Sequence, residues 1–300
     1  FLRISQLTSI LTRPMNVTDG TEFVLLGLTH HPELQVLLFI FFLLVYVIII
    51  VGNAFIFTMI MIDPLLHTPM YFFLKVLSFL DICYSSVTLP QMLVNFLSED
   101  KRISHTGCAT QMFFLLFLGA SECFLLAAMA YDRYIAICKP LRYRIIMNKT
   151  VCISFTILCW FIGNVVSLLQ TLWVFSLPFC GSNQINYLFC DIPPLIKLSC
   201  IDTTLYEIHV LKMTSSEGRH RAFSTCSSHI MVVTLYYGSG SLIYLRPNSI
   251  NVQDSNKVLA LMYTTITPML NPIIYSLRNK EVNGAIKRMM LKRKLFFSKR

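Results

Sequence analysis

The sequence contains apolar runs longer than the helices of a soluble domain require. Leu37–Val51 has almost nothing polar in fifteen residues, and apolar residues continue on both sides of it. A helix that crosses the hydrocarbon core of a bilayer needs about 20 such residues. The whole chain is 55% hydrophobic and only 13% charged, about half the charged share of an average soluble domain. These properties argue against a soluble domain and exclude a disulfide miniprotein, a disordered tail and a coiled coil.

Six segments are long and apolar enough to cross a membrane. None has the single charged face that a surface helix of a soluble protein shows. We therefore predict an all-α helical transmembrane bundle over residues 34–277, with an N-terminal segment of residues 1–33 and a basic, amphipathic tail of residues 278–300. The predicted spans are Leu34–Ile62, Met70–Phe96, Gln111–Tyr131, Val151–Leu177, Ser227–Leu245 and Val258–Leu277.

The N-terminal segment is not expected to contain a cleavable signal peptide, because no apolar core with a small-residue cleavage site precedes Met15. We interpret residues 1–14 as an upstream extension and expect the first span to target the chain. Asn16 begins a glycosylation acceptor triplet, which has meaning only if the N-terminus is outside. A second triplet, at Asn148, lies in the most basic loop and is expected to be cytoplasmic and unmodified.

The formal net charge of +10 would suggest a nucleic-acid partner in a soluble protein. With the N-terminus outside, however, seventeen Lys and Arg residues fall on inner segments and seven on outer ones. This is the distribution that orients a membrane protein, and we expect no nucleic-acid partner. Nine of the inner charges lie from Arg278 to Arg300. We interpret this tail as a solvated cytoplasmic anchor, with binding of anionic lipid as the alternative.

Four of the ten cysteines fall on the predicted outer side, which is an oxidising compartment. We expect these four to form disulfides, although the sequence alone allows three pairings. The other six lie within spans or near the cytoplasm, where free thiols are expected. The outer four are Cys108, Cys180, Cys190 and Cys200.

Two polar motifs lie at the inner ends of predicted spans. Asp132 and Arg133 close the third span, where a charged pair is costly unless it is paired or switched; it is either a charge-based latch or a pair that snorkels to the interface. Pro272 lies inside the last span and should kink the helix, because proline removes a backbone donor. We expect Asn271 or water to satisfy the carbonyls that the kink frees.

Together with Gly52, Asn53, Asp81 and Trp160, these motifs resemble the rhodopsin-like G protein-coupled receptors. A closer match, from about Thr21 to Lys287, identifies the chain as similar to the olfactory receptors. The resemblance implies a small volatile or hydrophobic ligand bound from outside, a stimulatory G protein of the olfactory type and cyclic AMP inside, and a multi-pass protein of the plasma membrane. The segments that carry it are Leu66–Tyr71, Met129–Tyr143, Arg221–Cys226 and Pro268–Asn279.

The same resemblance assigns individual roles. It pairs Cys108 with Cys190 and Cys180 with Cys200. The ligand-contact candidates, each also open to ordinary packing, are Leu115, Leu116, Gly119, Ala120, Gly240, Tyr244, Leu261 and Thr264. The activation-switch candidates are Asp132, Arg133, Tyr134, Tyr237, Asn271, Pro272 and Tyr275.

Asp81 and Glu122 are carboxylates within neighbouring spans, and in lipid such groups demand a partner. The resemblance suggests a sodium ion held between them, and a shared proton is the alternative. No other cofactor is expected.

The chain departs from the family in one place, because a receptor of this class has seven spans and only six are found. Residues 202–216 would form a helix of about 22 Å, too short for a hydrocarbon core of about 30 Å, and four of them are charged or histidine. The fifth span looks excised near His209. With six crossings instead of seven, both ends of the chain would lie on the same side of the membrane. One of three outcomes follows: the basic tail ends outside, one apolar segment stays uninserted, or a short polar segment is drawn through the membrane.

Three interpretations follow. The chain is an odorant receptor by descent; or it is a splice, allelic or pseudogene product that is retained in the endoplasmic reticulum and does not signal; or it is a transporter or channel. The third would require an inverted repeat with paired broken helices, and neither is visible. An enzyme is not expected, because Asp81 and Glu122 lack a neighbouring nucleophile and base.

Overall fold

The computed structural model describes residues 22–28, 31–179, 182–200, 257, 261–277, 284 and 288. The predicted span Ser227–Leu245 lies outside these residues. So do the candidate residues Asn16, Cys180, Tyr237, Gly240 and Tyr244.

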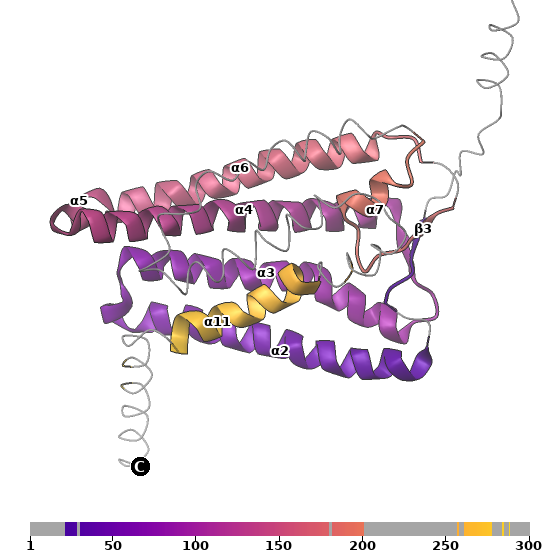
Figure 1. Cartoon of the computed structure of the whole chain (residues 1–300), viewed down its shortest axis with the longest axis horizontal. Helices are drawn as coiled ribbons and strands as arrows, with labels where there is room; N and C mark the ends of the chain where they lie inside the picture. Colours follow the sequence, from indigo (N-terminus) through magenta and orange to yellow (C-terminus); the bar gives the residue numbers. More distant parts are fainter. Residues whose placement is uncertain are drawn as a thin grey trace, which may run out of the picture.

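Four long helices form the frame of the described structure (Figure 1). Each is long and apolar enough to cross a membrane, which agrees with the first four predicted spans. They are α2 (Pro32–Ile62), α3 (Pro69–Leu97), α4 (His105–Cys138) and α6 (Lys149–Phe175). α4 starts earlier and ends later than predicted, because a helix can continue into polar surroundings beyond the apolar core.

Local sequence explains where these helices begin. Pro69 occupies the first turn of α3, where its missing N–H is not needed. Ser104 caps α4, its hydroxyl accepting from Gly107 N at 3.0 Å. Asn148 caps α6 by accepting from Val151 N at 3.0 Å. These side chains satisfy backbone donors that a helix start leaves unpaired. Asn148 therefore has a structural role as a helix cap, independent of any glycosylation.

The frame is apolar outside and polar inside, as a membrane bundle requires. Large apolar side chains such as Leu37 and Phe161 are more than 60% exposed, whereas Asn53, Asp81 and Glu122 are at most 1% exposed. In water this arrangement would be unfavourable, because exposed apolar area is costly. In lipid, polar groups are costly when they are exposed to the hydrocarbon, and here they lie inside the bundle.

A glycine allows a close contact between two helices of the frame. α4 and α6 lie side by side (Figure 1), and a Cβ built on Gly163 of α6 would lie 2.3 Å from Ser121 Oγ and 3.0 Å from Phe117 O of α4. Only a residue without a side chain fits there. Small residues that let helix backbones approach are typical of membrane helix pairs.

The last span consists of a π-helical turn, η4 (Met262–Ile266), and α11 (Thr267–Leu277). Figure 1 shows α11, in yellow, against α2 and α3. Four short helices lie in the loops between the long ones: η1 (Pro64–Leu66), η2 (Pro140–Arg142), α5 (Tyr143–Ile146) and α7 (Ile192–Ile196).

Two contacts give the direction of the last span. Before it, Lys257 Nζ donates to Gly27 O at 3.0 Å, next to the strand that follows the N-terminus. After it, Arg288 Nη2 lies 2.7 Å from Asp63 Oδ2, between α2 and α3. The span therefore runs from the side where α2 begins to the side where α2 ends.

A small sheet covers the outer end, and the all-α prediction did not include it. Its order is β2 (Arg102–Ser104), β1 (Glu22–Leu25) and β3 (Gln184–Ile185), with β1 antiparallel to β2 and parallel to β3. Gly27, with φ of 72°, turns the chain out of β1, a conformation that favours glycine.

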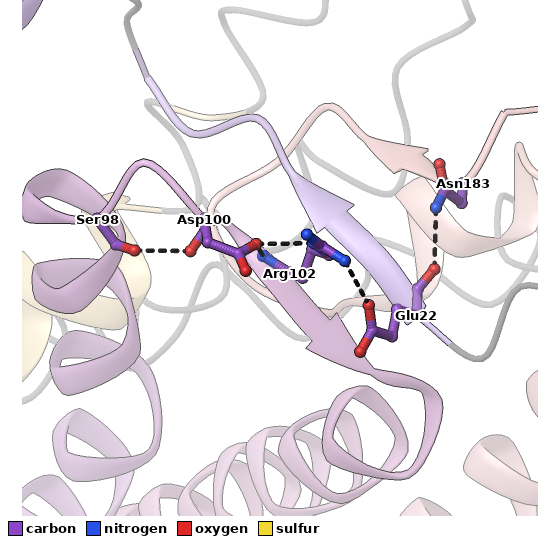
Figure 2. A network of polar contacts seen from close by, with 5 residues as sticks. All are labelled: Glu22, Ser98, Asp100, Arg102 and Asn183. Atoms are coloured by element: carbon purple, nitrogen blue, oxygen red, sulfur yellow. Dashed lines mark hydrogen bonds and ion pairs between the residues drawn. The ribbon is translucent and has the colours of Figure 1, made fainter.

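Side chains tie the same segments together (Figure 2). Arg102 lies between Asp100, at 2.9 Å, and Glu22, at 3.4 Å. Asn183 Nδ2 donates to Glu22 O at 3.1 Å. The N-terminal strand is thus held to both the first and the second outer loops.

Candidate functional site

The outer end is closed by the predicted disulfide between Cys108 and Cys190, whose Cα atoms are 5.4 Å apart. It joins the start of α4 to the second outer loop and confirms this pairing among the three possible ones. Because disulfides form in oxidising compartments, this end of the bundle is the one expected to face such a compartment.

The second predicted pair is only partly within the described residues. Phe179 and Ser199 form an antiparallel bridge, and Cys200 N donates to Pro178 O at 2.9 Å. Cys200 is disulfide-bonded, but Cys180 lies outside the described residues. The Cys180–Cys200 pairing therefore stays a prediction.

Gln111 is an outer-end residue that the sequence analysis missed. Its Oε1 accepts from Cys190 N at 3.0 Å, and its Nε2 donates to Val87 O at 3.3 Å. It therefore links α4, α3 and the second outer loop just below the disulfide. Its position three residues after Cys108, on the same helix face, was a signal that could have indicated this role.

The ligand-contact candidates lie on two elements in the described structure. Leu115 is buried in α4, and Leu116, Gly119 and Ala120 are half-buried nearby. Leu261 and the buried Thr264 lie in the last span. The ligand pocket between these two groups stays a prediction.

The centre of the bundle contains a polar cluster built from four helices, α2, α3, α4 and α11. Asp81 of α3 is fully buried, and Asn271 Nδ2 of α11 donates to its two carboxylate oxygens at 3.1 and 2.9 Å. The predicted switch residue Asn271 therefore ties the last span to the frame.

Asn53 satisfies the carbonyl that the proline kink frees. Pro272 has no N–H to donate to Pro268 O, and Asn53 Nδ2 of α2 donates to that oxygen instead, at 3.1 Å. The prediction that Asn271 does this was wrong, because the Asn271 amide is directed to Asp81. Gly52 makes the approach possible, since a Cβ there would lie 3.3 Å from the Pro272 ring.

Glu122 completes the cluster from α4. It is 1% exposed, and neither carboxylate oxygen has a hydrogen-bond partner within the described part of the chain. It interacts electrostatically with Asp81. The Oδ1 atoms of Asn53 and Asn271 and the hydroxyl of Ser121 are also without partners there. Hard oxygen donors of this kind suit a small cation, so the predicted sodium site fits these residues chemically.

The inner end of α4 contains the predicted latch in a closed arrangement. Asp132 is 1% exposed and is paired with its neighbour Arg133. Its other oxygen accepts from Tyr143 Oη at 2.8 Å. Burial, and then the hydrogen bond to Asp132, raise the pKa of Tyr143 above its ordinary value, so the phenol remains a donor. Tyr134 is 54% exposed and is not part of this cluster.

Of the remaining switch candidates, Pro272 lies inside α11 against Gly52. Tyr275 belongs to the same helix, but its side chain is outside the described part.

An apolar bundle with an outer disulfide, a polar core and an Asp–Arg pair at the inner end of its third span defines a G protein-coupled receptor. A family model described as olfactory receptor matches residues 42–209 and 205–293. Olfactory receptor 10A7 of Homo sapiens is 50% identical over 93% of this chain and 97% of its own length. Olfactory receptor 5G9 of Mus musculus is 46% identical, over 94% and 98%.

The chain belongs to the olfactory receptor family. Its relatives are receptors, which favours neither a transporter nor an enzyme.

The same comparisons locate the departure from the family. The alignment with olfactory receptor 10A7 runs over 306 positions but includes 93% of the 300 residues, or about 279, so about 27 positions of the relative have no counterpart here. The two segments that match the family model overlap at residues 205–209. About 27 residues is the length of one membrane-spanning helix, and the overlap coincides with the excision predicted near His209.

Proposed function

We propose that the chain is built as an odorant receptor of the plasma membrane that binds a small hydrophobic ligand from outside and activates a stimulatory G protein, raising cyclic AMP inside. The observation that carries this proposal is 50% identity to an olfactory receptor across 93% of the chain. That range includes the disulfide-closed outer end and the Asp132–Arg133 latch.

The proposed mechanism uses groups already paired in the described structure. Ligand contacts at the outer half would shift the last span relative to α2 and α3. The hydrogen bonds of Asn53 and Asn271 would carry this shift along the kinked α11. Arg133 would then leave Asp132 and become available to the G protein at the inner face.

Within this mechanism we propose that Asp81 and Glu122 share a sodium ion. Sodium would balance two buried negative charges that otherwise repel each other. The alternative is one proton shared by the pair. Sodium dependence of the thermal unfolding midpoint, which Glu122→Gln abolishes, would distinguish the ion from the proton.

A second candidate function is supported by the missing span. A receptor that lacks about 27 aligned positions loses one wall of its predicted pocket and part of its inner surface. Such a chain would be retained in the endoplasmic reticulum and would not signal.

Restoring the missing positions separates the two candidates. The restored variant carries the corresponding residues of olfactory receptor 10A7 inserted at residues 205–209. We expect it to reach the surface and to raise cyclic AMP with a broad odorant mixture. The first candidate function predicts the same behaviour for the unmodified chain, and the second predicts that the unmodified chain does neither. The restored Arg133→Ala variant is the matched control, which should reach the surface without signalling. Odorant-dependent cyclic AMP from the unmodified chain would rule out the second candidate.

A further inference from the structure

A cavity of about 440 Å³ opens at the inner end of the bundle, opposite the disulfide. It lies between the end of α2, the start of α3 and the start of α6. Met61, Phe72 and Met147 contribute apolar walls, and Lys75 and Lys149 contribute two ammonium groups. None of these five residues belongs to the predicted ligand or switch sites.

Lys75 has no anionic partner among the described residues. Its ammonium group contacts Met61 Sδ at 3.5 Å and lies 5.4 Å from the centre of the Phe72 ring. The position is six residues into α3, about 9 Å along the helix from Pro69, within the inner part of a membrane-spanning segment. A cation at that depth is costly unless it is paired or reaches the interface.

Asp63, an acid at the same end of the bundle, already has partners. Asp63 pairs with Arg288 at 2.7 Å and also accepts from Leu65 N. Lys149, the second cation of the cavity, lies in the first turn of α6, where the helix dipole adds positive potential and favours an anion. The cavity therefore combines an apolar wall with positive charge that the described residues leave uncompensated.

We propose that this cavity binds an anionic phospholipid of the cytoplasmic leaflet, with the headgroup phosphate between Lys75 and Lys149 and an acyl chain against Met61 and Phe72. The inner leaflet is the source of such lipids. The site is distinct from the basic tail, and it does not depend on odorant binding or on signalling.

The test uses the purified full chain and dioleoyl phosphatidylserine, with dioleoyl phosphatidylcholine for comparison. Retained lipid is counted by native mass spectrometry. We expect selective retention of phosphatidylserine, a reduction of about fivefold with Lys75→Gln, and about thirtyfold with the double variant Lys75→Gln/Lys149→Gln. Lys75→Arg should retain the lipid because it preserves the charge.

The matched control is Lys139→Gln/Arg144→Gln, which removes two charges from the same inner end, outside the cavity lining. It should retain phosphatidylserine as the unmodified chain does. An equal loss in this control would show binding to general surface charge and would overturn the proposal. Equal retention of phosphatidylcholine would also overturn it. So would displacement by soluble glycerophosphoserine at the same concentration, because the acyl chain would then contribute nothing.

Discussion

Asn53 of α2 donates a hydrogen bond to the carbonyl oxygen of Pro268, 215 residues later in the chain, at 3.1 Å. The acceptor is free because the residue four positions further along is Pro272, which has no N–H. The carbonyl that Pro272 leaves free in the last span and the amide of Asn53 in the first span therefore form one structural unit. Gly52 allows the two helices to come close enough to form it.

Replacing Asn53 should destabilise the bundle because the carbonyl oxygen of Pro268 loses its donor. Asn53→Leu leaves a buried acceptor unpaired, which costs about 1–3 kcal/mol. The buried free thiols of Cys152 and Cys159 provide the measurement, because they react with a thiol-specific dye only on thermal unfolding. Asn164→Leu, at an exposed position of α6, is the control and should leave the unfolding midpoint almost unchanged. Equal midpoints for the two variants would contradict the assigned role.

The contact between α4 and α6 predicts strong coupling between two small residues. Gly163→Ala places a methyl group 2.3 Å from Ser121 Oγ, and overpacking of this kind costs about 1–3 kcal/mol. Ser121→Gly in the same chain removes that oxygen and should recover part of the loss. A double-mutant cycle on the unfolding midpoint measures the coupling, and strictly additive effects would contradict the packing.

The four long helices could be predicted from the sequence because apolar runs of this length have no other stable arrangement in lipid. The Cys108–Cys190 pairing came from resemblance, since spacing alone left three choices. The partner of the freed carbonyl was assigned incorrectly, because nothing local distinguishes the amide of Asn53 from that of Asn271. Both lie near proline in the folded chain, and only the three-dimensional arrangement directs Asn271 to Asp81.

The outer sheet was missed for a related reason. Strands of two to four residues carry almost no periodic signal in a sequence. The sheet exists because the disulfide brings the loops together and the Arg102 ion pairs hold Glu22 beside them. The roles of Gln111 and Tyr143 were not predicted either, because the residues that they contact are distant in sequence or lie across a turn.

Tyr143 should hold the inner latch closed. Tyr143→Phe removes the 2.8 Å hydrogen bond to Asp132 and should raise basal cyclic AMP in the restored seven-span variant, because Arg133 then has a weaker counterion. Tyr131→Phe, at an exposed position of α4, is the control and should leave basal cyclic AMP unchanged. Lower basal activity in Tyr143→Phe would show that this hydroxyl supports the active state instead.

The same hydroxyl predicts a pH dependence of stability. Because burial and the hydrogen bond raise the pKa of Tyr143 above its ordinary value, its contribution is fully present below about pH 10 and is lost as the pH rises through the raised value. Unfolding midpoints measured from neutral to alkaline pH should fall less in Tyr143→Phe than in the unmodified chain. Parallel curves would contradict this coupling.

The direction of the last span predicts the side on which the tail lies. Cys200 lies beside Pro178 at the outer end, Lys257 reaches Gly27 at the outer end, and Arg288 reaches Asp63 at the inner end. From these contacts we predict an even number of crossings between residues 200 and 257 and a cytoplasmic tail. An epitope tag after Arg300 should be stained only in permeabilised cells, even in molecules that reach the surface.

A tag before Met15 serves as the control and should be stained on intact cells wherever the protein is displayed. A glycosylation acceptor introduced at residues 215–217 then distinguishes no crossing from two crossings between residues 200 and 257. Modification there indicates that neither the short polar segment nor Ser227–Leu245 crosses, whereas an unmodified acceptor in a chain glycosylated at Asn16 indicates that both do. Staining of the Arg300 tag on intact cells would contradict the contact between Arg288 and Asp63, because that contact requires both residues on the inner side.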